Sequence, residues 1–496
     1  MTFGADPEGT RLPIKLDTTT NGEYLPVPLP HAARHANRVA HDWAGQIAKR
    51  LGKTRRQFLK SSCGAAGTLL AMNHAFAEAG QTGGYFEVSA DAAFEPELAA
   101  KTVEGNEFIF DVQGHHVNPN GKWRDQLVNQ WKVGLRFFPQ ASCKNEQDTI
   151  ACFSAENFIK EIFLDSDTDL CVLSAVPAAP EDNPLSTEEA AATRAMVEAM
   201  EGDHRLLIHG LVHPQIPGAI DNMQTQVDDF KISAWKTYTQ WGPNGRGFWL
   251  YDEEYGIPMI ERARDLGVKI ICTHKGLPLP GILFGGRYTK YARPSDIGVV
   301  AKMFPDMTFI VYHSGYEPDH VEGPYNSDAD DVIGVDELVK SLQDNGVEPN
   351  SNVYAELGST WRNVMKDPTQ AAHLMGKLLK YVGEDRVLWG TDSIWYGSPQ
   401  DQIQAFRTFQ ISEAFQEKYG YPKITKEIRQ KVFGLNAVTP YKLTPEEIRK
   451  RASNTDRIGK ERHAYLDDPD PSFETYGPKT RREFFNLLQL NDGNPV

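Results

Sequence analysis

The sequence predicts an α/β fold, a closed (β/α)8 barrel of the TIM type followed by a C-terminal arm. Eight short apolar runs alternate with longer, helix-compatible segments between Asn106 and Ser393. Each run is nearly continuous in apolar residues at its start, as expected for a strand buried on both faces. Eight alternating β and α segments favour a barrel over an open doubly wound sheet, because no glycine-rich phosphate loop follows the first run.

The predicted strands and domains follow from these runs. The eight strands are expected at 108–117, 170–177, 205–214, 230–238, 268–276, 308–315, 352–359 and 386–393. Helices are expected between them, for example at 192–200 and 258–267. The barrel domain then spans 100–440. The charged, proline-broken residues 441–496 predict a surface arm that is a candidate homo-oligomer interface.

Composition narrows the class of protein. The 496 residues include 52 basic and 67 acidic side chains, for a net charge of −15. The mean hydropathy of −0.47 is that of an ordinary globular protein and argues against a multi-span membrane protein. The acidic balance argues against binding to nucleic acid or to anionic lipid. We expect a small-molecule substrate and no stable membrane anchor.

The N-terminal region contains the pattern of an export signal. Residues 54–60 read TRRQFLK, a mildly apolar run follows at 63–72, and Ala75-Phe76-Ala77 resembles a cleavage site. This pattern resembles a bacterial twin-arginine signal with an extended n-region, here residues 1–77. It implies recognition by the twin-arginine export machinery and a periplasmic location. The alternative is a cytoplasmic protein in which the same stretch is an amphipathic helix of a folded N-terminal region.

Five cysteines are too few for a disulfide framework. Cys143 and Cys152 are close enough in sequence to form one bridge in an oxidising compartment, and whether they pair is left open. Cys171 and Cys272 lie in apolar strand-like runs and are expected to be small core residues. No C-x-x-C pair is present, which argues against a zinc site made of cysteines.

Polar residues gather at the carboxyl ends of the predicted strands. They are Gln113, His115, His116, His213, Lys236, His274, Lys275, His313, Glu356 and Asp392. In a barrel these ends meet at one mouth. A single histidine at a strand end is usually only hydrogen-bonded in place. Several imidazoles from different strands, together with a carboxylate, are the donors that a divalent metal ion requires.

Four of these strands and a later helix carry a family resemblance. The segments DVQGHHV, VKIICTHKG, TFIVYHSG and VLWGTDS, with VFGLNA at 432–437, resemble the metal-dependent amidohydrolase superfamily. The most similar branch is the amidohydrolase-related one, which includes enzymes like aminocarboxymuconate semialdehyde decarboxylase. The resemblance covers about residues 100–440 and implies one divalent ion, zinc or manganese.

The resemblance also implies a set of metal ligands. His115, His274 and Asp392 match the ligands on the first, fifth and eighth strands. The family's first strand carries H-x-H, and Gln113 replaces its first histidine here. A glutamine oxygen is a poor zinc ligand but a tolerable one for manganese or magnesium. His116 is the alternative to His115.

The same comparison assigns catalytic roles. Asp392 is expected to move the proton, and His313 to polarise the substrate or to bind metal. Lys236 is expected to bind a substrate carboxylate or carbonyl, with Lys275 as a further candidate. For three other residues, a core or orienting role is at least as plausible: His209, His213 and Glu356.

Two reactions fit this residue set. The first is hydrolysis of a small, anionic, cyclic or aromatic amide, ester or lactone, in which the metal activates water. The second is non-oxidative decarboxylation of an aromatic or unsaturated acid, with Asp392 as the proton donor. The aromatic residues near the strand ends suggested the substrate class: Trp235, Tyr238, Trp241 and Trp395. A non-catalytic binding protein with a degenerate metal site is the alternative of another class.

Overall fold

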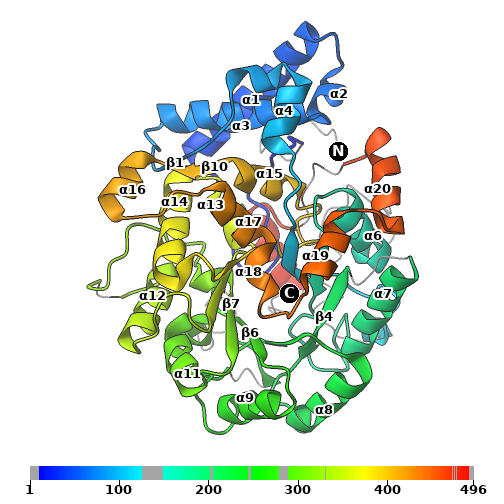
Figure 1. Ribbon diagram of the computed structural model, residues 1–496, viewed down its shortest axis with the longest axis vertical. Coiled ribbons are helices and arrows are strands. Elements are labelled where there is room, and N and C mark those ends of the chain that lie inside the picture. Colours follow the sequence, from blue (N-terminus) through cyan, green and yellow to red (C-terminus); the bar gives the residue numbers. More distant parts are fainter. Residues whose placement is uncertain are drawn as a thin grey trace.

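The eight predicted strands form one parallel barrel in chain order (Figure 1). The computed structural model describes residues 11–490 except 126–148, 201–204, 244–246, 279–288, 330, 472, 474 and 476. The barrel strands are β2 (Phe110–Gly114), β3 (Leu170–Leu173), β4 (Leu206–Leu211), β5 (Ala234–Thr237), β6 (Ile270–His274), β7 (Thr308–Tyr312), β8 (Val353–Glu356) and β9 (Val387–Leu388). Each lies inside a predicted run, so the predicted (β/α)8 fold is confirmed.

The barrel closes between its last and first strands. Val112 N donates to Trp389 O at 3.0 Å, and Asp392 N donates to Gln113 O at 3.0 Å. A parallel bridge joins Gly114 to Ser393. The closure therefore brings the polar end of the first strand directly beside that of the eighth.

Apolar side chains fill the barrel interior below the site. Val112, Val172, Cys272 and Ile310 are buried there, and Tyr441 closes the bottom of the same cluster. Because the interior is packed, ligands can bind only at an end of the barrel. Cys171 and Cys272 are both buried free thiols, which confirms their prediction as core residues.

Helices surround the barrel. They are α6 (Ala155–Ile159), α7 (Thr187–Ala199), α8 (Ala219–Phe230), α9 (Gly256–Asp265), α11 (Ile297–Met303), α12 (Val335–Asp344), α13 (Thr360–Val364), α14 (Pro368–Lys377), α15 (Gln400–Thr408), α16 (Glu413–Tyr419), α17 (Lys426–Gln430) and α18 (Asn436–Val438). The helices predicted at 192–200 and 258–267 correspond to α7 and α9. A capping box, in which Ser186 and Glu189 exchange hydrogen bonds, starts α7.

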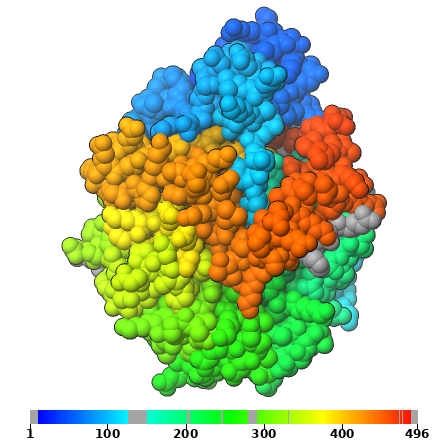
Figure 2. Space-filling model, viewed as in Figure 1, coloured from blue at the N-terminus to red at the C-terminus, as the bar shows by residue number. Residues whose placement is uncertain are grey.

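A layer of four helices covers one end of the molecule (Figure 2). These are α1 (His31–Arg50), α2 (Arg55–Leu59), α3 (Ser62–Glu78) and α4 (Pro96–Val103). Between the layer and the barrel, β1 (Gly84–Phe86) pairs antiparallel with β10 (Phe409–Ile411), a small sheet that the sequence analysis did not predict. Small residues such as Ala36 and Ala66 let α1 and α3 pack closely.

The stretch with the twin-arginine pattern forms α2 and α3 of this layer. The apolar part of α3 is buried, including Leu69, Met72 and Phe76. Within the described part of the chain, no helix combines the length and apolar character needed to cross a membrane. Export through the twin-arginine machinery remains a prediction, as does cleavage after Ala77.

Residues 11–30, which we call the strap, run from the N-terminal layer into the barrel mouth. Residues 12–22 are all buried although they form no helix or strand. Arg362 Nη2 donates to Asp17 Oδ1 at 2.6 Å, and both side chains are excluded from solvent. On the barrel side, Lys15 N donates to Asp401 Oδ2 at 3.2 Å. These buried polar contacts replace the water that an exposed loop would bind.

The C-terminal arm packs on its own barrel and on the strap. It contains α19 (Pro445–Ala452), α20 (Arg457–Asp467) and α21 (Arg481–Leu490). The buried guanidinium of Arg205 donates to Asp456 at 2.8 Å through Nη2. Pro478 O accepts from Thr20 N of the strap at 3.0 Å. Homo-oligomerisation through the arm remains a prediction. Pairing of Cys143 with Cys152 also remains open, because Cys143 lies outside the described residues.

We predict that Asp17→Asn destabilises the protein by about 3–5 kcal/mol, because it leaves the buried Arg362 charge unpaired. The loss should appear in thermal unfolding, with faster proteolysis between residues 12 and 30. Asp91→Asn, the same change at an exposed position, is the control and should unfold like the wild type. Equal stability of the two variants would contradict a structural role for the ion pair.

The same ion pair predicts a pH dependence. The Arg362 charge opposes the effect of burial and holds the pKa of Asp17 below its ordinary value. A carboxylate with a lowered pKa stabilises the fold above its unfolded pKa of about 3.9, and the benefit is lost as the pH falls below it. The difference in unfolding free energy between wild type and Asp17→Asn should be constant above about pH 5 and shrink below about pH 4.

Candidate metal centre

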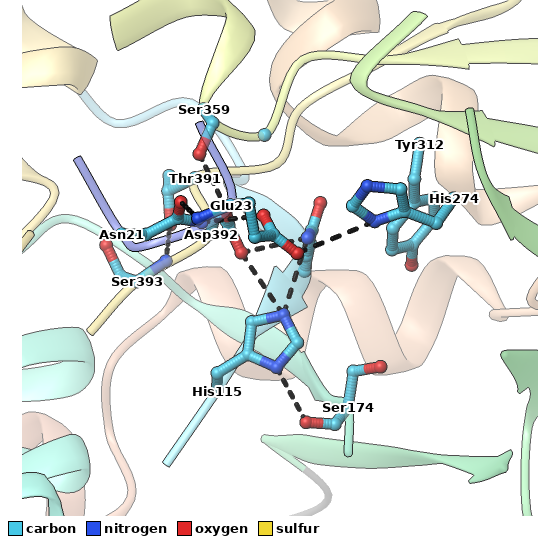
Figure 3. A network of polar contacts seen from close by, with 12 residues as sticks. Asn21, Glu23, His115, Ser174, His274, Tyr312, Ser359, Thr391, Asp392 and Ser393 are labelled. Carbon is cyan, nitrogen blue, oxygen red and sulfur yellow. Dashed lines mark hydrogen bonds and ion pairs between the residues drawn. The ribbon is translucent and has the colours of Figure 1, made fainter. Parts of the chain in front are cut away.

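The carboxyl ends of four strands bring histidine and acidic side chains together (Figure 3). Gln113 lies on β2 with His115 just after it, and His274 is the last residue of β6. His313 follows β7 and Asp392 follows β9. The three histidines and Asp392 are at most 2% exposed.

The backbone is strained where these strands end. His313 has a φ of 66°, Asp392 of 61° and Ser359 of 54°. Residues with a side chain rarely adopt this left-handed region, which costs about 1–3 kcal/mol each and is typical of functional sites. Hydrogen bonds hold the strained residues in place: Thr360 Oγ1, for example, donates to His313 O at 3.0 Å.

Backbone carbonyls fix the tautomers of two imidazoles. His115 Nδ1 donates to Ser174 O at 2.8 Å, and His313 Nδ1 donates to Gly358 O at 2.7 Å. A carbonyl can only accept, so Nδ1 of each ring carries a proton and Nε2 of each ring faces the site. Burial lowers the pKa of His313 to about 4, which keeps this ring neutral. Metal-ligating histidines are typically held in this way, with one ring nitrogen donating to a carbonyl and the other facing the metal.

Asp392 is held by donors on both carboxylate oxygens. Gln113 Nε2 donates to Oδ1 at 2.9 Å, and His115 Nε2 lies 3.2 Å from the same oxygen. Ser359 Oγ donates to Oδ2 at 2.5 Å and Asn21 Nδ2 donates to it at 3.0 Å. Burial alone would raise the pKa of Asp392, but His115 and the other partners lower it to about 2. The group is therefore a stable carboxylate.

A second carboxylate, Glu23, enters the site from the strap. Asn21 Nδ2 donates to Glu23 Oε2 at 2.7 Å as well as to Asp392, so one amide bridges the two acids. Glu23 Oε1 lies 3.8 Å from His274 Nδ1. Burial and the negative charge of Asp392 raise the pKa of Glu23 to about 8. Two carboxylates so placed favour uptake of a proton or a cation.

The structure splits the predicted residues into two neighbouring groups. Among the described residues, the set of three ligand atoms that all lie within 4.8 Å of one another is Glu23, His274 and His313. His313 Nε2 and His274 Nδ1 are 3.2 Å apart. His115, Asp392 and Gln113 form the second group, joined to the first through Asn21. The sequence analysis missed Asn21 and Glu23, since no periodic pattern or motif marks the strap.

The amide nitrogen of Gln113, rather than its oxygen, is turned toward Asp392, and metal binding by the oxygen stays a prediction. Its amide nitrogen faces Asp392 Oδ1, with His115 Nε2 3.4 Å away. Its oxygen lies buried beside Gly358 and has no hydrogen-bond partner in the part of the chain that the structure describes. Gln113 therefore orients Asp392. The remaining donors, neutral imidazoles and carboxylates, fit zinc or manganese.

Lys236 lies in the barrel interior with its charge against aromatic rings. Its Nζ is 3.5 Å from the centre of the Tyr312 ring and 4.9 Å from that of Tyr238. The amine is buried and has no hydrogen-bond partner among the described residues. Burial lowers the pKa of Lys236 to about 8, although the nearby acids Glu356 and Asp392 act against this. The geometry leaves all three amine donors available.

Glu356 supports the site from below. Its carboxylate accepts from His313 N at 3.0 Å and from Gly358 N at 2.6 Å. Burial raises its pKa to about 8. Gly390 packs against this carboxylate so closely that a Cβ there would overlap it. Glu356 thus positions the turn that carries His313.

Four candidates point elsewhere. His116 Nε2 contacts Thr193 Oγ1 of α7 at 3.0 Å, outside the barrel. His209 Nε2 lies 3.3 Å from Tyr441 OH at the barrel bottom. The His213 ring packs on Trp241 with centroids 4.3 Å apart.

Lys275 is the fourth of these. It forms a fully buried ion pair with Asp296 at 2.8 Å, so its charge already has a partner inside the protein. The expected aromatic residues also divide between two places. Tyr238 and Trp395 contact the site through His274 and His115, respectively. Trp235 is a fully buried core residue.

Several solved structures are similar to this chain. They include 2,6-dihydroxybenzoate decarboxylase from Rhizobium, with 15% identity and a TM-score of 0.38 over 68% of this chain and 99% of that one. 5-Carboxyvanillate decarboxylase from Sphingomonas paucimobilis has 13% identity and a TM-score of 0.40 over 68% of this chain and 99% of that one. A putative 2-pyrone-4,6-dicarboxylic acid hydrolase from Pseudomonas putida has 12% identity and a TM-score of 0.37 over 68% of this chain and 97% of that one. No curated protein matches the sequence.

A family model described as amidohydrolase matches residues 175–443. The match starts after β3 and runs through the last barrel strand, so it includes His274, His313 and Asp392. The strap and β2, with Glu23, Gln113 and His115, lie outside it. Because the match covers more than half of the 496 residues, the protein belongs to the amidohydrolase family.

Proposed function

We propose that this protein is a metal-dependent hydrolase that acts on a small, anionic, cyclic or aromatic amide, ester or lactone. The observation that carries the proposal is the convergence of oriented, neutral imidazoles and carboxylates at the carboxyl end of an amidohydrolase barrel. One divalent ion, zinc or manganese, would be held by His274 and its neighbours His115, His313 and Asp392. When bound, such an ion supplies Lewis acidity toward water and toward a substrate oxygen.

Asp392 is the candidate general base of the reaction. Asn21 and Ser359 donate to its Oδ2, while Gln113 donates to Oδ1, which also lies beside the ring of His115. A carboxylate stabilised in its charged form can accept a proton from the attacking water at Oδ1 and pass it to the leaving group. Ser174 holds the His115 ring beside this oxygen.

The surroundings of the centre support an anionic substrate. No described residue accepts a hydrogen bond from the Lys236 amine, which lies near the acids of the site. A substrate carboxylate or carbonyl would provide this amine with an acceptor. The rings of Tyr238 and Trp395 would pack against a flat substrate beside His274 and His115.

Decarboxylation of an aromatic or unsaturated acid is the second candidate. The observation that favours it is the burial of the centre, because His274, His313 and Asp392 are at most 1% exposed. Exclusion of water destabilises a substrate carboxylate relative to the less polar transition state in which CO2 leaves. In this reaction Asp392 would first take up a proton and then deliver it to the carbon that loses CO2.

We predict that elemental analysis of the purified protein finds about one zinc or manganese ion per chain. His274→Ala should lose the ion because it removes a nitrogen ligand. Asp392→Asn should lower both metal content and activity, the latter by about 10²–10⁴-fold if Asp392 moves the proton. A folded wild-type protein that binds no divalent ion would contradict the metal mechanism and would support a non-catalytic binding role.

The two reactions predict different products. Hydrolysis in H2(18)O should place one labelled oxygen in the product without release of gas. Decarboxylation should release CO2 and place a solvent hydrogen, traceable in D2O, on the reacting carbon. Screens of lactones, cyclic amides, esters and hydroxybenzoic acids, read by mass spectrometry, distinguish them. Stoichiometric CO2 without labelled oxygen in the product would overturn the hydrolase proposal.

A further inference from the structure

We propose that Glu23 of the strap is a ligand of the metal ion and that the strap is a permanent part of the active protein. This inference rests on the proposed function, which places one divalent ion at the barrel mouth. It adds a ligand that comes from outside the barrel and outside the segment matched by the family model.

The first step is that β2 leaves a ligand position unfilled. Gln113 stands where the metal-binding strand would present its first donor. Its amide nitrogen faces Asp392 Oδ1 at 2.9 Å, and its oxygen lies beside Gly358. With Gln113 occupied in this way, β2 contributes only His115 to the site. Glu23 of the strap places an anionic oxygen beside His274 and His313.

The second step is the position of Glu23. Its Oε1 is 3.8 Å from His274 Nδ1, and His313 Nε2 completes a set of three donor atoms that all lie within 4.8 Å. Donors bound at about 2.0–2.2 Å to one ion lie roughly 3–4 Å from one another. The three side chains therefore need only small movements to share an ion.

The third step is that the strap is built to hold Glu23 there. Asn21 Oδ1 accepts from Glu23 N at 3.1 Å, while its amide nitrogen donates to the carboxylates of Glu23 and Asp392. The hydroxyls of Tyr24 and Tyr396 share a hydrogen bond at 3.1 Å. Asp17 is paired with Arg362, so contacts on both sides of Glu23 anchor the chain. A carboxylate fixed by its neighbours in this manner binds metal with little further ordering.

The fourth step is charge. Asp392 and Glu23 share one neutral donor, the Asn21 amide nitrogen. A divalent cation next to Glu23, His274 and His313 would offset both negative charges. Lys236 cannot do so by contact, because its amine lies against the Tyr312 ring.

The inference has a consequence for the fate of the N-terminal region. A chain cut after Ala77 would lack the strap with Glu23, the helices α1 and α2, and all but the last residue of α3. The metal-loaded protein should therefore retain its N-terminal residues, in whichever compartment it works.

The test compares Mn²⁺ and Zn²⁺ binding by calorimetry in the full-length wild type, Glu23→Gln and Glu97→Gln. Glutamine keeps the size of Glu23 and the strap contacts but removes the anionic ligand. We expect Glu23→Gln to weaken binding by at least 10–100-fold, the range lost when even an outer partner of a ligand is removed. Glu97→Gln makes the same change on an exposed turn of α4 and should bind like the wild type. Glu23→Asp, with a shorter carboxylate, should recover part of the affinity.

The outcomes separate this inference from the proposed function. If the wild type binds no ion, the proposed function fails. If the wild type and Glu23→Gln bind equally while His274→Ala does not bind, the function stands and the role of Glu23 is refuted. Metal-free thermal unfolding of Glu23→Gln checks the fold, and a large loss of stability there would make the role of Glu23 structural rather than metal-binding.

The intact mass tests retention independently. The protein is expressed in a bacterium that carries the twin-arginine machinery, and the metal-loaded fraction is weighed by mass spectrometry. A mass that includes residues 12–77 is expected. A metal-loaded chain that begins after Ala77 would overturn the proposal.

Discussion

Asn21 donates from one amide nitrogen to both Asp392 and Glu23 and so keeps two carboxylates together in a mouth from which water is largely excluded. The surrounding side chains offset the repulsion between these two carboxylates. The burial of two like charges is unfavourable unless donors or a cation accompany them. The donors come from Gln113, Ser359 and the strap, and the proposed ion supplies the rest.

The strap depends in turn on contacts from the whole length of the chain. Asp17 pairs with Arg362 of α13, and Thr20 donates to Pro478 of the arm. The N-terminal layer continues the strap into α1, where Asn37 Nδ2 donates to Leu16 O at 2.8 Å. The barrel alone would leave the acids of the site open to solvent. The strap and the C-terminal arm, which lie outside the eight strands, cover the mouth of the barrel.

The barrel was predictable because burial on both faces leaves a clear apolar signature in each strand. The positions of His274, His313 and Asp392 at one mouth followed from that pattern, since the carboxyl ends of parallel strands meet. Lys275 shows the limit of this argument, because a charged residue at a strand end can equally pair inside the protein, here with Asp296. Glu23 could not be found from the sequence. Its position depends on tertiary contacts of an irregular segment, which carries no periodic signal and also precedes a pattern that resembles an export signal.

The account's central claim is that the strap and the barrel build one metal centre. Crystals of the full-length protein with Mn²⁺, measured at a wavelength where manganese scatters anomalously, test it most directly. The account predicts one anomalous peak within about 2.0–2.4 Å of a Glu23 oxygen and of nitrogens from His274 and His313. A peak bound by His115 and Asp392 with Glu23 turned away, or no peak at the barrel mouth, would contradict it.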